Sequence, residues 1–328
     1  MKRTLIAIIA IVATAFAEDA EFSVPVIGYV FDSASKQIRP LTGTPGAAVA
    51  GRGISIEGAE TVLVARDGAF ALVSSTNADS LSIIRRTGST TESISLSGVP
   101  SVFDAGALST GGDVAIVYAA QCNCVRILSD LGTDPKLLRT IPLMESSEVR
   151  ALAINDRATT AAISVKVAGE SKLLIYAAES DLPSELTLSS SALAFDGPGE
   201  KLLVADEQTQ DVYLISDLTP APTLSRILSA ADGLKAPISV GVGQDSSVIV
   251  GDADTGVYVW SSSDGTTRHV ECACRPTTVQ RTATSGMYRI SGAETGAVWI
   301  LQLDGEMART FFVPVVKESS NAVGEGTR

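Results

Sequence analysis

The segment that decides the fold is residues 201–217, which read KLLVADEQTQDVYLISD. An apolar run ends in Ala205 and Asp206, a short polar stretch follows, and a second apolar run then begins. Residues 248–261 (VIVGDADTGVYVWS) and 288–301 (YRISGAETGAVWIL) have the same form, the latter with Gly-Ala in place of Gly-Asp. Short apolar runs joined by polar turns predict β-hairpins, so one kind of hairpin recurs along the chain.

The recurrence has a regular period over the whole chain. Seven pairs of predicted strands each begin at an apolar residue, and the distance from one such marker to the next is 39 to 54 residues. Repeats of roughly 40 to 50 residues are typical of propeller blades and of paired-helix solenoids. The seven markers are Ile27, Leu81, Val125, Leu173, Val212, Val257 and Val298.

Residue type decides between these two architectures. Gly (28 residues), Pro (13 residues), Ser and Thr interrupt the chain too often for helices of about 10 to 15 residues. Most repeats also contain two further runs of small and β-branched residues before the marker, such as 237–243 (PISVGVG) and 247–253 (SVIVGDA). A four-stranded unit cannot cover both of its faces alone, so neighbouring units must stack and close radially. We therefore expect an all-β fold, a β-propeller of four-stranded blades.

The three quoted segments resemble the repeats of NHL- and YVTN-type β-propellers. In those repeats a strand that ends in Ala-Asp is followed by a short polar turn and a Val-rich strand, as in residues 201–217. The resemblance covers most of the chain as a pattern, and it implies an architecture without implying one activity. WD40 repeats match less well, because Trp260 and Trp299 are followed by Ser and Ile rather than by Asp.

The sequence is compatible with two different numbers of blades. Seven strand pairs predict seven blades of about 44 residues each, which is the interpretation that we favour. The first pair, residues 26–32 and 37–41, has no strands before it, so the C-terminus would have to supply them to close the ring. The alternative is a six-bladed ring with an accessory N-terminal hairpin, whose blades start near Thr61, Val99, Val149, Ser191, Pro237 and Pro276.

The N-terminus has the organisation of an export signal. Lys2 and Arg3 precede an apolar run over residues 4–16, and the small-x-small sequence of residues 15–17 is followed by two acidic residues. The apolar run of 13 residues is shorter than the roughly 20 residues that a membrane-spanning helix needs. We therefore expect a signal peptide that is removed after Ala17.

The domain organisation follows from this signal and from the repeats. We expect a signal peptide at residues 1–17, a single β-propeller domain at 18–316 and a flexible polar tail at 317–328. No later stretch is apolar enough to span a bilayer. The predicted location is the periplasm or the extracellular space, and the simple signal favours a bacterial source.

Charge excludes two classes of partner. The chain has 25 Lys and Arg residues against 37 Asp and Glu residues, a net charge of −12 and a pI near 4.6. This is the same sign as the charge of nucleic acids and of anionic lipids, so neither is expected as a partner. The single histidine, His269, argues against sites that are built on several imidazoles.

Four cysteines form two Cys-x-Cys pairs, Cys122 with Cys124 and Cys272 with Cys274. An even number of cysteines in an exported chain favours disulfides. The pairs lie three repeats apart, so a local bridge within each bent turn is favoured over a bridge across the ring. A four-thiolate metal site requires all four side chains to converge. A redox-active pair is the remaining alternative, although only Arg275 would favour a thiolate.

No residue stands out as catalytic or as a cofactor ligand. Asp252 and Asp254 resemble the start of a calcium loop, but Ser263 stands where such a loop has its glutamate, so a hairpin turn is favoured. His269 is expected on an outer strand, facing solvent or half-buried. The sequence contains no nucleophile elbow, no phosphate-binding loop and no dinucleotide fingerprint. We therefore predict no catalytic and no cofactor-binding residues, and leave a divalent metal open.

Two classes of function remain. The first is an exported, monomeric binding or scaffold propeller, whose loops on one face hold a protein, peptide or glycan without catalysis. The second is a metal-dependent propeller enzyme of the lactonase or lyase type, with carboxylates at the mouth of the central channel. The scarcity of catalytic residue types favours the first class. The discriminating observation is whether three or more carboxylates converge in the channel.

Overall fold

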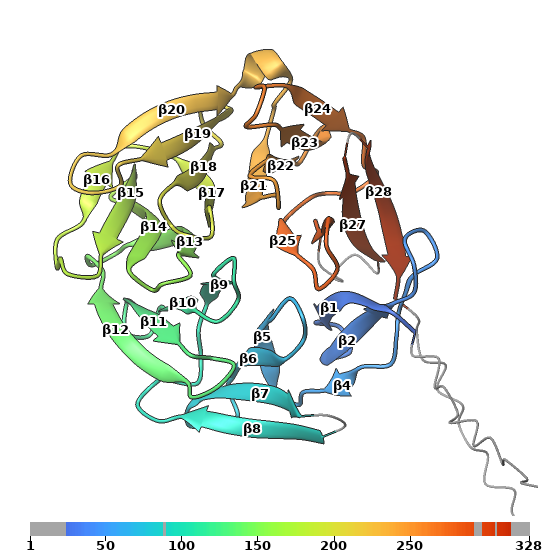
Figure 1. Ribbon diagram of the computed structural model, residues 1–328. Coiled ribbons are helices and arrows are strands. Elements are labelled where there is room, and N and C mark those ends of the chain that lie inside the picture. The colour runs from blue at the N-terminus through green and yellow to red at the C-terminus, as the bar shows by residue number, and fades with distance from the viewer. Residues whose placement is uncertain (1–23, 88–89, 292–296, 306, 316–328) are drawn as a thin grey trace, which may run out of the picture.

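Seven antiparallel sheets stand around a central channel in the computed structural model (Figure 1). The structure describes residues 24–87, 90–291, 297–305 and 307–315. Each sheet contains four strands that follow one another along the chain, and within the described residues the one helical element is a 3-10 turn, η1 (Ala230–Asp232). The chain is a seven-bladed β-propeller. The predicted signal peptide (1–17) and the tail (317–328) lie outside the described residues.

The blades use the chain from residue 26 to residue 314. Blade 1 contains β1 (Val26–Asp32), β2 (Gln37–Thr42), β3 (Val49–Ala50) and β4 (Ile54–Ser55), and blade 2 contains β5 (Ala59–Val64), β6 (Phe70–Ser75), β7 (Leu81–Thr87) and β8 (Thr90–Leu96). Blade 3 contains β9 (Ala105–Leu108), β10 (Ala115–Ala119), β11 (Cys124–Ser129) and β12 (Lys136–Pro142), and blade 4 contains β13 (Glu148–Ile154), β14 (Thr160–Val167), β15 (Glu170–Ala177) and β16 (Ser184–Leu186). Blade 5 contains β17 (Ser190–Phe195), β18 (Leu202–Asp206), β19 (Asp211–Ser216) and β20 (Thr223–Leu228). Blade 6 contains β21 (Pro237–Val242), β22 (Val248–Asp252), β23 (Gly256–Trp260) and β24 (Thr267–Val270), and blade 7 contains β25 (Gln280–Arg281), β26 (Met287–Arg289), β27 (Ala297–Asp304) and β28 (Met307–Pro314).

The hydrophobic core lies between neighbouring blades. The middle strands are covered on both faces, so strands such as β6 (FALVSS) and β18 (LLVAD) are buried at every position. The outermost strand β20 is exposed at most of its positions. Phe70 and Leu72 of blade 2 pack with Val117 and Leu128 of blade 3, and similar clusters join the other blades. Burial on both faces explains why the inner runs read as continuous apolar segments rather than as alternating ones.

Blade 1 lacks an innermost strand. Both β3 and β4 pair with β2, so together they form one interrupted outer edge, and β1 is the inner edge of a sheet three strands deep. In its place, Gln280 Nε2 of β25 donates a hydrogen bond to the Val64 carbonyl of β5 at 3.0 Å. The inner strands of blades 7 and 2 are therefore joined directly, and six strands surround the channel.

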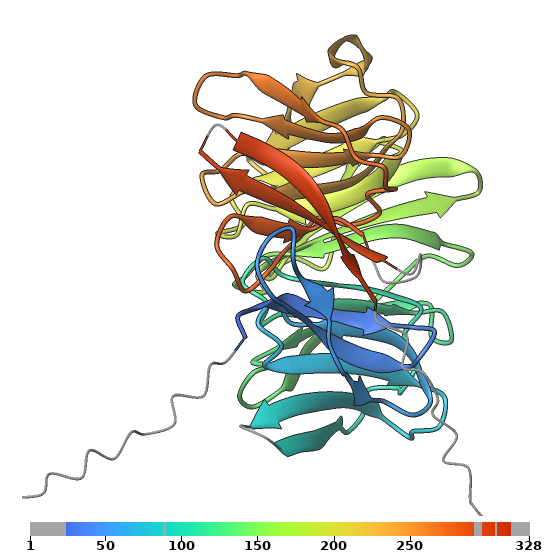
Figure 2. The ribbon, with the colours of Figure 1, turned by 90° about the vertical axis from the view of Figure 1, so that its right-hand side faces the viewer.

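This arrangement corrects two expectations about ring closure. The alternative of six blades with an accessory hairpin is wrong, because residues 26–55 form a blade of the ring. Within the described residues, which end at Val315, the C-terminal part of the chain does not supply the strands missing before β1. Instead, the chain just after β28 makes a parallel bridge from Val315 to Ala50 of β3, and the blue and red segments adjoin in Figure 2. Leu41 packs with Val298 and Val313 across this junction.

Two predicted blade starts also lie too early in the chain. The first strand of blade 3 begins at Ala105 rather than near Val99, and that of blade 7 begins at Gln280 rather than near Pro276. Val99 and Phe103 are buried in the connection from blade 2, where they join the core between blades 2 and 3. An apolar connection has the same composition as a strand, which explains the error.

The strand order gives the ring two distinct faces. The turns between the first and second strands of blades 2–7 lie on one face, which we call the first-turn face. The turns between second and third strands lie on the opposite face, with the connections from one blade to the next, and we call this the linker face. Within the described part of the chain, no helix is long and apolar enough to cross a membrane.

Candidate functional site: the central channel

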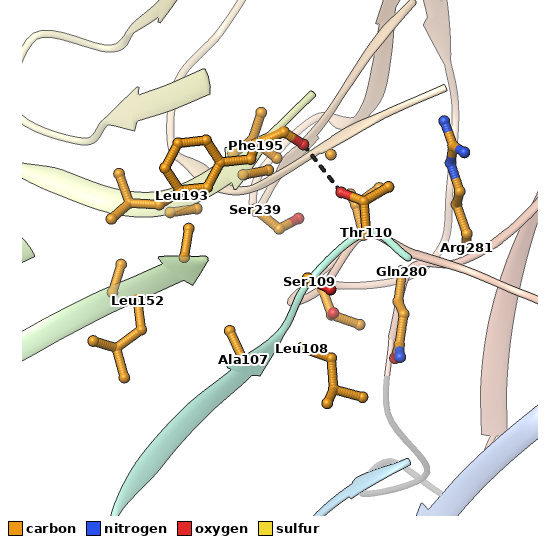
Figure 3. Close-up of a pocket in the computed structure, with 18 of the residues that line it drawn as sticks. Ala107, Leu108, Ser109, Thr110, Leu152, Leu193, Phe195, Ser239, Gln280 and Arg281 are labelled. Carbon is orange, nitrogen blue, oxygen red and sulfur yellow. Dashed lines mark hydrogen bonds between the residues drawn. The ribbon is translucent and has the colours of Figure 1, made fainter. Parts of the chain in front are cut away.

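The central channel is the main cavity candidate for binding. It has a volume of about 360 Å³ and is lined by β5, β9, β13, β17, β21 and β25, the inner strands of blades 2 to 7 (Figure 3). Many of the lining residues are apolar, Leu108, Leu152, Leu193 and Phe195 among them, but polar atoms contribute about half of the exposed surface. A cavity of this size and character accommodates a small molecule.

The charged residues in the described lining are three arginines: Arg66, Arg281 and Arg289. No Asp, Glu, His or Cys lines the channel among the residues that the structure describes. The chain as a whole carries a net charge of −12, so the channel has the opposite sign to the protein around it. Guanidinium groups stay protonated at any ordinary pH, which suits them to bind anions and not to transfer protons.

Arg281 is held in place by main-chain carbonyls. It lies at the end of β25, where its Nε donates to the Val242 carbonyl at 3.1 Å and its Nη2 donates to the Gly243 carbonyl. Both carbonyls belong to the end of β21 in blade 6. A guanidinium has five N–H donors, and the Nη1 group of Arg281 donates to no residue in the described structure. The Nε and Nη2 groups are therefore held by blade 6, whereas the Nη1 group is available to a ligand.

Arg66 lies at the same end of the neighbouring inner strand. It follows β5 in the turn of blade 2, is exposed, and makes no hydrogen bond or ion pair with the residues that the structure describes. Because Gln280 joins β25 directly to β5, the strands that carry Arg281 and Arg66 are neighbours around the channel. Both arginines lie at the channel mouth on the first-turn face.

A loop covers the opposite side of this mouth. Residues 109–112 connect β9 to β10, and Thr110 Oγ1 donates to the Phe195 carbonyl of blade 5 at 3.1 Å (Figure 3). The Gly111 amide donates to the carboxylate of Asp156 in blade 4. The loop thus reaches from blade 3 past blade 4 to blade 5, which leaves the arginine side of the mouth as the open side.

Tyr288 is the buried titratable group of the channel wall. Its hydroxyl accepts a hydrogen bond from the Gln244 amide at 3.0 Å, and burial raises the pKa of the phenol. A neutral phenol of raised pKa is a poor general base at neutral pH. Among the described residues there is also no group of three or more His, Cys, Asp or Glu that could hold a metal ion.

The cysteines lie on the other face of the ring. Cys122 is close to Cys124 in the turn between β10 and β11, with Cα atoms 5.2 Å apart, and Cys272 is close to Cys274 in the connection from β24 to β25, with Cα atoms 5.1 Å apart. These spacings have the geometry of local disulfides. Both pairs lie on the linker face and in different blades, so the structure does not bring the four sulfur atoms together.

Asp252 is a structural residue of its hairpin turn. Its carboxylate is fully buried and accepts main-chain N–H groups from Asp254 and Thr255 in the turn, and from Lys235 and Ala236 in the connection to β21. Burial alone would raise the pKa of this carboxyl, but these N–H donors hold it below the usual range. The hairpin interpretation of this segment is confirmed.

The recurring aspartate has the same role in a neighbouring blade. Asp206 is buried and accepts the amides of Gln208 and Thr209 in its turn and of Ser189 in the connection before β17. His269 lies on the outer strand β24, exposed as predicted, with Nε2 2.6 Å from the Thr255 carbonyl. Neither residue lines the channel.

Sequence reasoning missed the channel arginines. Arg66 and Arg281 stand in no motif, and each is one cation beside an ordinary polar turn. They lie 215 positions apart, and the inner strands that end beside them become neighbours only because blade 1 has no inner strand. The sequence could have revealed these arginines only through the exact residues at which the inner strands end, and amino-acid composition does not define those residues.

Comparisons with known proteins identify the fold and no family. No protein-family model matches the chain, and no curated protein matches it. Solved structures do. A functionally unknown protein from Desulfotomaculum acetoxidans has a TM-score of 0.61 at 13% identity, covering 89% of this chain and 100% of its own.

Two further solved structures have comparable similarity. Kuenenia stuttgartiensis hydrazine synthase has a TM-score of 0.59 at 13% identity, covering 88% of this chain and 99% of its own. A candidate 6-phosphogluconolactonase from Bacteroides uniformis has a TM-score of 0.56 at 12% identity, covering 88% and 96%. At these identities the likeness shows the propeller fold alone, because one fold hosts many functions.

Proposed function

We propose that this protein is an exported binding propeller that holds a ligand without transforming it. The observation that carries the proposal is the lining of the channel, a wall of mixed polar and apolar character with three arginines and, among the described residues, no carboxylate, imidazole or thiol. Such a lining offers hydrogen bonds and positive charge. Besides the arginines, its titratable group is the Tyr288 phenol, whose raised pKa makes it a poor general base near neutral pH, and the described lining contains no set of three metal-ligating side chains.

The partner we propose is a protein, peptide or glycan that contacts the loops around the ring, with the chain acting as a monomer. Repeats resembling those of NHL and YVTN propellers support a rigid scaffold that carries variable loops on its faces. The N-terminal sequence supports export, and removal after Ala17 would leave Glu18 as the first residue. The two close cysteine pairs suit an oxidising compartment.

An activity assay tests the absence of turnover. The purified mature protein is incubated with a panel of lactones and related esters, with calcium, magnesium, manganese or zinc, and product is measured against a heat-denatured sample. We expect no difference, because the described channel lining contains no carboxylate or imidazole for proton transfer and no set of three metal-ligating side chains. Turnover that disappears in an Arg66→Gln or Tyr288→Phe variant would overturn the proposal, since both side chains line the channel.

A further inference from the structure

Two features of the channel mouth together define a binding chemistry. Arg281 is fixed by the carbonyls of Val242 and Gly243 and keeps unused N–H donors. Arg66, on the neighbouring inner strand, has no partner among the described residues. Positioned guanidinium groups favour carboxylate and phosphate, because they match the geometry of two oxygen acceptors.

The wall beside these arginines includes apolar side chains. Leu108, at the end of β9 on the same face, is partly exposed, whereas Val64 at the end of β5 is buried in the core between blades 1 and 2. An inorganic anion would leave this surface in contact with water, whereas an organic acid would cover it. The volume of about 360 Å³ lies at the lower end of the range for small-molecule sites, which excludes a folded domain from the channel itself.

The acidic charge of the protein does not outweigh the arginines at this position. Charges separated by more than about 8 Å are largely screened at physiological ionic strength, so the local groups dominate. The carboxylates of the nearest turns are engaged by the main chain. Asp67 accepts the Ala69 amide at 3.0 Å, and Asp156 accepts the Gly111 amide under the covering loop. Asp245, two residues after the Gly243 carbonyl that holds Arg281, accepts the Ser247 amide at 3.1 Å.

We propose that the channel mouth on the first-turn face, from Arg281 beside blade 6 to Arg66 in blade 2, binds a small organic acid. Its anionic group lies against Arg66 and Arg281, and its apolar part lies along Leu108. This goes beyond the proposed function, on which it rests only in treating the channel as a binding site. Entry is from the first-turn face, on the side that residues 109–112 leave open.

The test measures binding of defined probes by isothermal titration and by ligand-observed NMR at constant ionic strength. Hexanoate is compared with hexanamide, which has the same chain without the charge, and with inorganic phosphate, which has charge without the chain. We expect hexanoate to bind at least tenfold more tightly than either probe. Equal binding of hexanoate and hexanamide, or binding of phosphate alone, would overturn the proposal.

Variants then locate the site. Arg66→Gln breaks no hydrogen bond in the described structure, and we expect it to weaken hexanoate binding at least fivefold. The matched control is Arg157→Gln, which removes an exposed arginine of the first-turn face that does not line the channel, and we expect its affinity to stay within twofold. Equal affinities of the two variants would overturn the proposal.

Arg281→Gln is the second variant, and it is compared only if it melts within 3 °C of the wild type, because it also loses bonds to β21. The outcomes remain distinguishable from those of the activity assay. If hexanoate does not bind and no lactone is turned over, only this inference is wrong. If a lactone is turned over, the proposed function is wrong even if hexanoate binds.

Discussion

Replacing Asp252 by alanine is expected to lower the free energy of unfolding by about 4 kcal/mol, which is roughly 6 °C in Tm for a chain of this size. The carboxylate of Asp252 accepts four main-chain N–H groups and is fully buried. Alanine leaves those donors without a partner in a place where water cannot replace the carboxylate. Thermal and urea unfolding of the wild type and the variant measure the loss.

The matched control is Asp254→Ala, two residues further along the same turn. Asp254 is exposed, and its side chain makes no hydrogen bond or ion pair with the described residues, so we expect a change below about 0.5 kcal/mol. Equal losses for the two variants would show that the turn tolerates loss of either carboxylate, contrary to the structural role given to Asp252.

The same carboxylate predicts a dependence on pH. Its pKa is held below the usual range in the folded protein, so it stabilises the fold at pH values above the unfolded pKa of about 4. That contribution is lost as the pH falls through the folded pKa. The difference in Tm between the wild type and Asp252→Asn should therefore be constant from pH 7 to pH 5 and shrink below pH 4. A difference that stays constant to pH 2 would contradict the assignment.

Replacing Gly251 by alanine is expected to cost about 3 kcal/mol, from overpacking and from loss of a buried hydrogen bond. A Cβ atom at Gly251 would lie 2.5 Å from the Pro276 carbonyl oxygen and closer still to Ser239 Oγ. Those two atoms form a buried hydrogen bond, at 2.5 Å, that ties blade 6 to the connection into blade 7. The new methyl group must therefore separate the pair.

The control for Gly251 is Gly51→Ala in blade 1. A Cβ atom there would meet Pro40 at ordinary contact distances of 3.4 Å and more, so we expect little change in Tm. Both glycines lack a positive φ, so the comparison isolates packing from backbone strain. A Gly251→Ala protein as stable as Gly51→Ala would show that blades 6 and 7 do not meet through Ser239 and Pro276.

Much of the fold is contained in local sequence. Runs such as residues 201–217 predict strands and turns because hydrophobic pattern and turn residues act over a few positions. The strand β1 was predicted, but its place as the inner edge of a blade without an innermost strand could not be. That place depends on the contact between Gln280 and Val64, which lie 216 positions apart in the sequence. For the same reason the presence of Arg66 and Arg281 at one channel mouth could not be predicted. The candidate site depends on contacts between residues far apart in the sequence, whereas the strands and turns of the blades follow from the local sequence pattern.

A thermal-shift series with divalent metals tests most directly the claim that the channel binds without a metal. The mature, oxidised protein is heated with calcium, magnesium, manganese or zinc, each with a chelator control. We predict no metal-specific rise in Tm, because the described residues contain no group of three metal-ligating side chains. A rise of several degrees with one metal that the chelator reverses would contradict this account and favour the metal-dependent enzyme.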